Sequence, residues 1–302
     1  MPNAFVTVSF QMSSTRVLIV GGHGQLGFEL QRSAPGNLDV VTIGRPEIDI
    51  TESDSIENIV QQYQPGVIIN AAAYTAVDKA ESEEQQAWLV NHKGAENLAA
   101  AAAGSDIRLI HVSTDFVFEG NNCRPRQPDD ATLPQSVYGK SKLAGERAVL
   151  QQAANALIVR TSWLYSSQGH NFVKTMLRLM GERDSIGIIA DQVGTPTWAN
   201  MLAKRLWELV ATDAKGIYHC SNNGVASWYD FAVAIQEEAV SIGLLQRTIA
   251  VTPIKTEAYP LPAERPAYSV LDVSATEQLL GRQLPHWRAS LRAMLLEMKC
   301  AE

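Results

Sequence analysis

The sequence has no cysteine pairing, no basic excess and no long apolar run, and each absence excludes a class of protein. The three cysteines (Cys123, Cys220 and Cys300) are odd in number and widely spaced, so they indicate neither a disulfide framework nor a zinc site. The net charge of -7 argues against nucleic-acid binding, which needs a basic surface. No apolar run approaches the roughly 20 residues of a membrane span. We therefore expect a cytoplasmic protein without nucleic-acid or membrane partners.

Apolar runs alternate with helical patterns along the first half of the chain. Strands are predicted at 16–20, 39–43, 67–70, 107–112 and 157–160, and helices at 53–63, 80–103 and 136–152. Continuous apolar strands separated by helices are typical of a parallel sheet that is covered on both faces. The sequence therefore predicts an α/β fold, a Rossmann-type doubly wound parallel sheet.

The second half of the chain is more irregular and carries many prolines. Helices are predicted at 171–181, 200–212, 227–242, 274–280 and 285–299, and short strands at 185–189, 216–220 and 249–253. Four prolines between 253 and 266 indicate loops there. We expect a smaller α/β lobe that is formed mainly by this C-terminal part and packs on the sheet.

Three glycines, Gly21, Gly24 and Gly27, stand between the first predicted strand and a helix that runs to about Arg32. A tight turn, a close approach to a pyrophosphate and close helix–strand packing each favour a residue without Cβ. The pyrophosphate would lie on the helix N-terminus, where free amides and the dipole favour negative charge. A plain turn is the alternative. The cofactor contacts that this loop predicts are Gly21, His23, Gly24, Gln25 and Leu26.

The end of the second predicted strand carries information about the cofactor. An NAD-specific site usually has an acid there to hold the ribose hydroxyls, but this chain has Arg45. A guanidinium suits a 2′-phosphate, so we predict NADPH, with NADH as the alternative. Asp49 and Ile50 are predicted beside the adenine, and Ala71, Ala72 and Ala73 where the cofactor backbone passes. The competing interpretation is a solvated arginine in a polar turn.

A potential proton-transfer group follows the fourth predicted strand. Thr114 stands at the end of that strand, and Tyr138 and Lys142 lie one turn apart on the following helix. A free phenol has a pKa near ~10, and a neighbouring cation would favour its ionised form and bring it into working range. We predict Thr114, Tyr138 and Lys142 as the catalytic residues, and Tyr138 and Lys142 also as cofactor contacts, with the lysine on a ribose hydroxyl. A surface Tyr–Lys pair is the alternative, because this spacing is common by chance.

These motifs resemble an extended short-chain dehydrogenase/reductase that acts on nucleotide sugars. More narrowly, the sequence resembles the dTDP-4-dehydrorhamnose reductase family in several stretches, in order, from about residue 16 to the C-terminus. They lie at 24–30, 48–51, 70–81, 113–120, 137–146, 160–165, 190–197 and 265–271. We expect a disordered extension at 1–15, an NADP-binding Rossmann domain at 16–162, and mainly the substrate-binding lobe at 163–302, with some segments returning to the Rossmann domain.

The resemblance implies reduction of a 4-keto-6-deoxy-L-sugar on dTDP, the last step towards dTDP-L-rhamnose. Hydride would pass from NADPH to C4 while Tyr138 protonates the oxygen. Thr114, Asp115, Trp163 and Arg265 would contact the dTDP-sugar substrate, Trp163 near the sugar and Arg265 near the diphosphate. A core aromatic and a surface arginine are the alternatives for the last two.

The resemblance leaves other activities to be weighed. A 4,6-dehydratase of the superfamily needs two carboxylates after the threonine, and Phe116 stands where the second would be. An epimerase remains an alternative that the later motifs fit less well. A non-catalytic NADP-binding subunit, like the β subunit of methionine adenosyltransferase, is the competitor from another class. It need not retain the Thr–Tyr–Lys set that this chain retains.

Some members of the family are described as dimers bridged by magnesium. Glu29 matches the acid of the first helix in such sites, whereas the segment 198–200 supplies no second acid. Glu29 is therefore a candidate Mg²⁺ ligand. The expected oligomeric state is a monomer or a homodimer.

Overall fold

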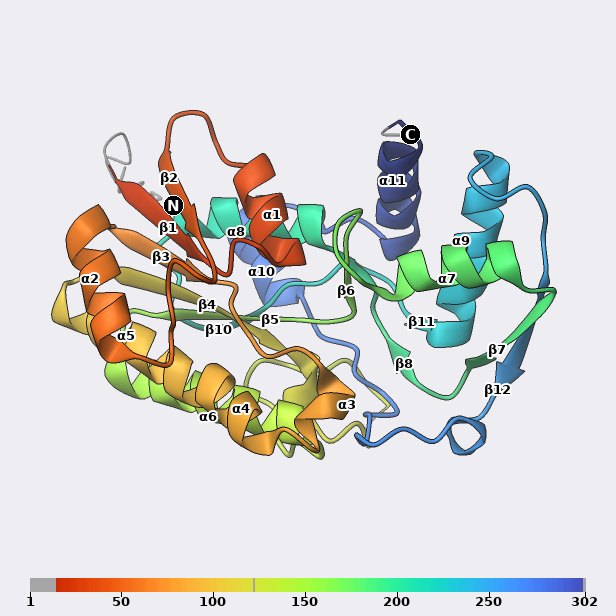
Figure 1. Cartoon of the computed structure of the whole chain (residues 1–302), viewed down its shortest axis with the longest axis horizontal. Helices are drawn as coiled ribbons and strands as arrows, with labels where there is room; N and C mark the ends of the chain where they lie inside the picture. Colours follow the sequence, from red (N-terminus) through yellow and green to blue (C-terminus); the bar gives the residue numbers. More distant parts are fainter. Residues whose placement is uncertain (1–14, 122, 301–302) are drawn as a thin grey trace, which may run out of the picture.

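The computed structural model describes residues 15–121 and 123–300. The extension expected at 1–15 lies outside these residues except for Thr15. A six-stranded parallel sheet forms the larger part of the molecule (Figure 1), in the order β10-β5-β4-β3-β1-β2. Its strands are β1 (Arg16–Val20), β2 (Asp39–Ile43), β3 (Val67–Asn70), β4 (Arg108–Thr114), β5 (Leu157–Thr161) and β10 (Gly216–His219). The predicted doubly wound α/β fold is confirmed.

Helices cover both faces of this sheet because alternate residues of each strand point to opposite sides. In β1, Val17 and Ile19 pack against α1 (Gln25–Arg32) and α8 (Ala199–Val210). Leu18 and Val20 pack on the other face against α2 (Ser53–Tyr63), α5 (Gly94–Gly104) and α6 (Val137–Gln152). The side chains of these four β1 residues are fully buried, which explains the continuous apolar run in the sequence.

The single helix predicted at 80–103 is interrupted near its start and is then helical to Gly104. The chain forms α3 (Val77–Ala80), a turn, α4 (Glu84–Trp88), a π-helical segment η2 (Leu89–Lys93) and then α5. The turn is stabilised by Ser82, whose amide and hydroxyl both donate to the carbonyl of Lys79. In η2 the Asn91 side chain accepts from Tyr74 N and donates to the Ser141 hydroxyl, so the π segment ties the loop after β3 to α6.

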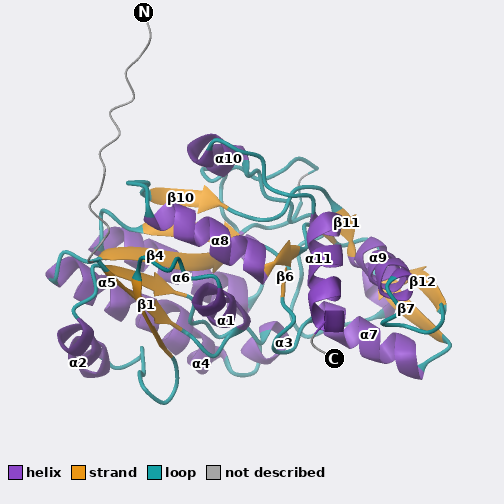
Figure 2. Cartoon of the chain, turned by 90° about the horizontal axis from the view of Figure 1, so that it is seen from above, coloured by secondary structure: helices purple, strands orange, loops and turns teal. Residues whose placement is uncertain are grey.

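The smaller part of the molecule has its own apolar core, and its helices lie beside the large sheet (Figure 2). It contains α7 (Phe172–Glu182), α9 (Trp228–Ser241) and α11 (Trp287–Cys300), with β7 (Ser185–Ile189) parallel to β12 (Ala250–Ile254). Four two-residue strands were not predicted because they are too short to show a period: β6 (Leu164–Tyr165), β8 (Val193–Gly194), β9 (Thr197–Trp198) and β11 (Ala226–Ser227).

Segments of the second half of the chain return to the large sheet. The strand predicted at 216–220 forms as β10 and pairs with β5 at the sheet edge. Helix α8 packs on α1, and α10 (Ser274–Leu280) contacts β10. Two 3-10 turns complete the described elements, η3 (Asp115–Val117) and η4 (Thr256–Ala258). Among the helices of the described chain, none has both the length and the apolar character needed to cross a membrane.

Candidate active site

The glycine loop after β1 is closely packed, and two of its glycines are sterically required. Gly21 has φ +91°, and a Cβ there would lie 2.5 Å from the amide nitrogen of Ala72. A Cβ on Gly27 would lie 2.3 Å from the carbonyl oxygen of Gly21. Loop, first helix and the end of β3 therefore pack backbone against backbone. A Cβ on Gly24 would meet only Gly21 O, at 3.3 Å, so its outer side is open to a ligand.

Helix α1 begins directly after this loop with no side-chain cap on Gly24. The amides of the first helical turn have no carbonyl partner within the helix, so they can bind an anion. Gln25 and Leu26 would contact such an anion through these backbone amides. The Leu26 side chain is buried in the core, and the Gln25 side chain accepts a hydrogen bond from Asn171.

A cavity of about 400 Å³ opens beside the loop at the carboxyl ends of β1, β2 and β3. It is lined by eight residues predicted to bind the cofactor: Gly21, His23, Gly24, Arg45, Ile50, Ala71, Ala72 and Ala73. Asp49 does not line it, because its carboxylate accepts from the amide and hydroxyl of Thr51. The cavity also takes Ile48, Tyr74, Thr75, Ala76 and Val90, which sequence reasoning did not assign. Tyr74, Thr75 and Ala76 directly continue the alanine run at 71–73, whereas Ile48 and Val90 had no such signal in the sequence.

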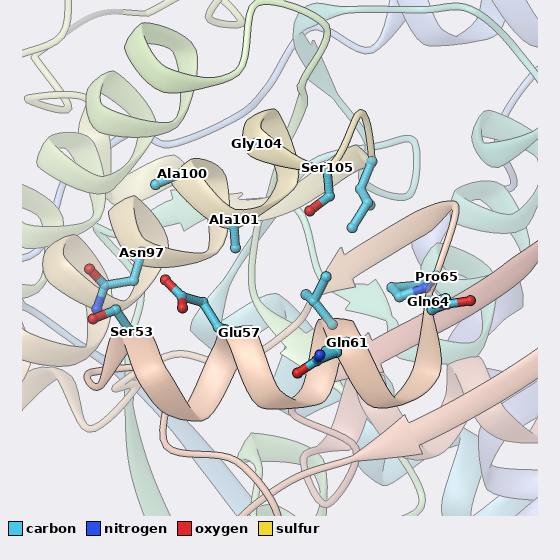
Figure 3. Close-up of a pocket in the computed structure, with 12 residues that line it drawn as sticks. Ser53, Glu57, Gln61, Gln64, Pro65, Asn97, Ala100, Ala101, Gly104 and Ser105 are labelled. Atoms are coloured by element: carbon cyan, nitrogen blue, oxygen red, sulfur yellow. The ribbon is translucent and has the colours of Figure 1, made fainter.

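Another hollow, of about 760 Å³, lies between α2 and α5 (Figure 3). Its lining combines short side chains of α5, such as Ala100 and Ala101, with polar side chains of α2, such as Glu57 and Gln61. It contains no residue that the sequence predicted for the site. Volume alone therefore does not locate the chemistry in this fold.

Thr114 and Tyr138 meet at the carboxyl end of β4. The Thr114 hydroxyl donates to Asp115 Oδ1 at 3.0 Å and accepts from the amide of Phe116 at 3.2 Å, which starts η3. The pKa of Tyr138 is raised to about 12, mainly by burial and also by the charge of Asp115, against a hydrogen bond with Thr114 that lowers it. The Phe116 ring packs edge-on against Tyr138, with centroids 5.5 Å apart. The phenol is thus a protonated group in a largely dry site.

Lys142 lies behind this pair and is 2% exposed. Its Nζ donates to the carbonyl of Val112 at 2.7 Å and lies 3.4 Å from Nε2 of His111. Burial lowers the pKa of Lys142 to about 8, with Glu146 opposing the shift. The expectation that Lys142 lowers the pKa of Tyr138 is not met in the chain alone, because burial dominates the phenol and the lysine is bonded to β4.

Asp115 is buried beside Thr114, at the position predicted to contact the substrate. Burial raises the pKa of its carboxyl to about 6, against hydrogen bonds from Ser269 and Thr114 that lower it. Because Ser269 comes from the C-terminal segment, this carboxyl joins the two parts of the chain at the site. The sequence did not indicate Ser269.

Trp163 is held rigidly between two neighbours. Its ring stacks on Trp228 with centroids 3.5 Å apart and an interplanar angle of 2°. A Cβ on Gly194 would lie 2.5 Å from Cε2 of this ring, and the Trp163 backbone has φ +44°, in the left-handed region. Strain of this kind persists where the surroundings fix the residue. Trp228, which the sequence did not single out, is therefore part of the candidate substrate side.

Arg265 is bonded to the Rossmann part of the molecule. Its guanidinium makes two hydrogen bonds to the carboxylate of Asp78 on α3, at 2.9 and 2.6 Å. Arg265 also lines a cavity of about 390 Å³ between α7, β7 and β12, which Trp228 lines as well. The arginine is thus neither a solvated side chain nor free for a ligand without giving up a partner.

The candidate metal ligand Glu29 does not fit that role. It is fully buried, and its oxygens accept hydrogen bonds from Ser166 at 2.9 Å, Asn200 at 2.9 Å and Arg32 at 2.7 Å. Four hydrogen bonds donated within the chain already occupy this carboxylate, three of them on Oε2 and one on Oε1. Within residues 15–121 and 123–300 no group of three or more His, Cys, Asp or Glu could hold a metal. Glu29 instead fastens α1 to α8 and to the segment after β6.

The sequence comparisons with known proteins point to one family. The sequence profile described as RmlD substrate binding domain matches residues 15–300. The dTDP-4-dehydrorhamnose reductase of Aggregatibacter actinomycetemcomitans is 42% identical over 92% of this chain and 97% of its own. The protein of the same name from Escherichia coli K12 is 41% identical over 93% of this chain and 97% of its own.

Solved structures agree. The dTDP-4-dehydrorhamnose reductase of Bacillus anthracis, in complex with NADP, has a TM-score of 0.89 and 38% identity, covering 94% of this chain and 99% of its own. The Clostridium acetobutylicum structure of that name has a TM-score of 0.89 and 39% identity, covering 94% of this chain and 100% of its own. The UDP-glucose 4-epimerase of Thermus thermophilus, at 18% identity and a TM-score of 0.80, shares the fold alone. The chain belongs to the dTDP-4-dehydrorhamnose reductase family.

Proposed function

We propose that this chain reduces the C4 keto group of dTDP-4-dehydro-β-L-rhamnose to give dTDP-L-rhamnose, with NADPH as the reductant. The observation that carries the proposal is the Tyr138 phenol, which burial keeps protonated at the end of β4 beside Thr114. A reduction of a ketone needs a proton donor at the developing alkoxide, and a phenol with a raised pKa supplies one without ionising first.

NADPH fits the cavity at the carboxyl ends of β1, β2 and β3. The open side of Gly24 and the free amides of α1 would hold the pyrophosphate. Arg45 lines the same cavity and would pair with a 2′-phosphate, which favours NADPH over NADH. The NADP bound by the Bacillus anthracis relative supports this assignment. When bound, the cofactor supplies the hydride.

The residues of this chain handle the oxygen and its proton. Tyr138 donates its proton to the C4 oxygen as negative charge develops there. Thr114 holds the same oxygen by a hydrogen bond, for which its hydroxyl must turn away from Asp115 Oδ1. Lys142 lies one helical turn beyond Tyr138 and its positive form opposes the charge left on the phenolate. Proximity of the three groups, fixed by β4 and α6, orients the ketone.

The remainder of the substrate would lie against the smaller part of the molecule. Trp163, fixed by Trp228, would pack against the sugar ring. The cavity of about 390 Å³ that Arg265 lines would take the nucleotide end, with the guanidinium on the diphosphate. All of these groups belong to one chain, so we propose that a monomer suffices for the chemistry and that a homodimer would hold two such sites. NADPH and a nucleotide sugar suit a cytoplasmic enzyme.

The decisive experiment is turnover. Purified protein should oxidise NADPH when given dTDP-4-dehydro-β-L-rhamnose made by the preceding enzymes, and Tyr138→Phe is the matched control. Retained NADPH binding without any turnover would favour a non-catalytic NADP-binding subunit instead. An accumulated product with the opposite configuration at a carbon other than C4 would favour an epimerase.

A further inference from the structure

A chain of buried polar side chains runs beneath the candidate active site, from β3 through β4 to α6. Asn70 ends β3, His111 lies at the matching position of β4, and Lys142 reaches down from α6. Nδ2 of Asn70 lies 2.9 Å from Nδ1 of His111, and Nε2 of His111 lies 3.4 Å from Nζ of Lys142. All three are at most 2% exposed, so no bulk solvent completes these contacts.

The direction of the first hydrogen bond is fixed by the backbone. The amide of Ala72 can only donate, and it donates to Oδ1 of Asn70 at 3.0 Å. The Asn70 side chain is thereby oriented, and its NH₂ group must point at Nδ1 of His111. Because a neutral imidazole has one acceptor and one donor nitrogen, Nδ1 accepts and Nε2 carries the hydrogen.

This tautomer decides what His111 presents to Lys142. The Nε2–H is directed at Nζ, which also donates to the carbonyl of Val112. A charged lysine has three donors and no acceptor, so it would face the imidazole donor to donor. An uncharged amine has a lone pair and can accept. Burial and the charge of Lys142 hold the pKa of His111 well below its ordinary value, so a neutral ring is the relevant form.

We propose that Asn70 and His111 are positioning residues for Lys142: by holding His111 in its Nε2–H tautomer, they favour the uncharged amine of that lysine. The other charged groups near Lys142 do not prevent this effect. Glu146, on its own helix, favours the charged form, but its oxygens already accept two hydrogen bonds from buried Arg160 of β5. Tyr138 lies one helical turn before Lys142, and the charge of Asp115, in η3, raises the pKa of Tyr138.

The consequence for catalysis rests on the proposed function. After giving its proton to the C4 oxygen, Tyr138 is a phenolate and needs a proton before the next turnover. Lys142 in its charged form can pass one to the phenolate and then take another from water. Because His111 favours the uncharged amine, the ammonium of Lys142 is a stronger acid than that of an ordinary lysine, and its donation to the phenolate is more favourable.

The first test reads the tautomer without any substrate. In protein labelled with ¹⁵N in its histidine rings, the His111 signals are identified by their loss in His111→Gln. We expect the Nε2–H pattern in the wild type across the neutral range. His219, a second buried histidine, lies in β10 at the edge of the sheet and takes no part in this chain of contacts, so it is an internal control. An Nδ1–H pattern for His111 would overturn the proposal.

The second test uses an isosteric substitution that reverses the direction of the hydrogen bond between residue 70 and His111. In Asn70→Asp the carboxylate still accepts from Ala72 but now also accepts from Nδ1–H, so Nε2 of His111 becomes an acceptor for the lysine ammonium. We expect the Nδ1–H pattern for His111, unchanged His219 signals, and a rise in the pKa of Lys142 of at least about one unit by ¹⁵N lysine titration. The pH at which kcat/KM falls on the alkaline side should rise as well.

The outcomes separate this inference from the proposed function. An unchanged tautomer and an unchanged Lys142 titration in folded Asn70→Asp would refute the inference, whatever the protein reduces. The expected spectra without dTDP-sugar turnover would leave the inference standing and refute the function. If Asn70→Asp does not fold, the wild-type tautomer alone decides.

Discussion

Arg265 and Asp78 form a two-pronged ion pair, at 2.9 and 2.6 Å, between the proline-rich segment near the C-terminus and α3 beneath the cofactor cavity. They are 187 residues apart in sequence. The pairing lowers the pKa of Asp78, mainly through the hydrogen bonds from Arg265. The same guanidinium lines the cavity assigned to the nucleotide end of the substrate, so one side chain can either join the two parts of the chain or bind a diphosphate.

Substitution distinguishes these two roles. If Arg265 binds the diphosphate, Arg265→Met should raise KM for the dTDP-sugar by about 10- to 100-fold, the value of a charged hydrogen bond, while Asp78→Asn leaves KM close to wild type. If the ion pair itself is what matters, both variants should lose activity and stability together. Initial-rate kinetics and thermal unfolding decide. Arg247→Met, which removes an exposed ion pair with Asp184 in the same part of the molecule, is the matched control.

Replacing Tyr138 by Phe removes one oxygen from a packed site and should leave the fold intact. We expect kcat to fall at least ~10²-fold, because the ketone loses its proton donor. NADPH affinity, measured by fluorescence titration, should stay within about 3-fold. Because the pKa of Tyr138 lies at about 12, the wild-type rate should show no loss from phenol ionisation below that pH. A Phe variant that turns over normally would show that another group is the acid.

Arg45 should decide between the two nicotinamide cofactors. Arg45→Ala removes the cation from the cavity that Gly24 and Ala72 also line, so KM for NADPH should rise by about 10-fold or more. KM for NADH should change little, since NADH has no 2′-phosphate, and it therefore serves as the internal control. Equal rises for both cofactors would mean that Arg45 supports the loop and does not read the phosphate.

The elements that the sequence predicted well are those with strong local signals. The buried strand β1 and the α6 helix that carries Tyr138 were located to within a residue or so, because a continuous apolar run and a sustained helical pattern are local signals. The turn at Ser82 was missed, because one serine in a good helical pattern does not show that its hydroxyl bonds back to Lys79. The pairing of Trp163 with Trp228 depends on tertiary packing, which no local pattern contains.

The same reason applies to the surroundings of Glu29. Position on the first helix is readable from sequence, and so is the neighbouring Arg32, but two of the donors to the carboxylate, Ser166 and Asn200, come from residues more than 130 positions away. The sequence likewise showed Lys142 one turn from Tyr138. It did not show that the lysine is bonded to β4, because burial of the helix face is a property of the assembled fold.

The Glu29 geometry predicts how the protein responds to chelation. Treatment with EDTA should leave thermal stability and NADPH-dependent activity unchanged, since Ser166, Asn200 and Arg32 already satisfy the carboxylate. Glu29→Gln should lower the free energy of unfolding by about 2 kcal/mol, because the amide donates where the carboxylate accepted and leaves buried donors facing each other. Restoration of chelated protein by Mg²⁺ would contradict this account and reinstate the metal.

Burial of Lys142 predicts a specific pH dependence of stability. Its pKa is about 8 in the folded chain against an ordinary 10.5, so between these pH values the unfolded chain binds more protons than the folded one. The group's contribution to stability therefore rises with pH across this window and is at its least favourable below about 8. Lys142→Met removes the contribution, so the stability of the variant relative to wild type should decline by about 3 kcal/mol from pH 8 to 10.5.

Denaturant unfolding of both proteins at several pH values measures this difference. The comparison cancels the alkaline titration of other groups, and any packing change from methionine is a constant offset. Lys93→Met, at an exposed lysine on the neighbouring π segment, should differ from wild type by a nearly constant amount. A stability difference for Lys142→Met that does not change with pH would show that the lysine titrates normally, and would remove the basis for its role as an alternating proton carrier.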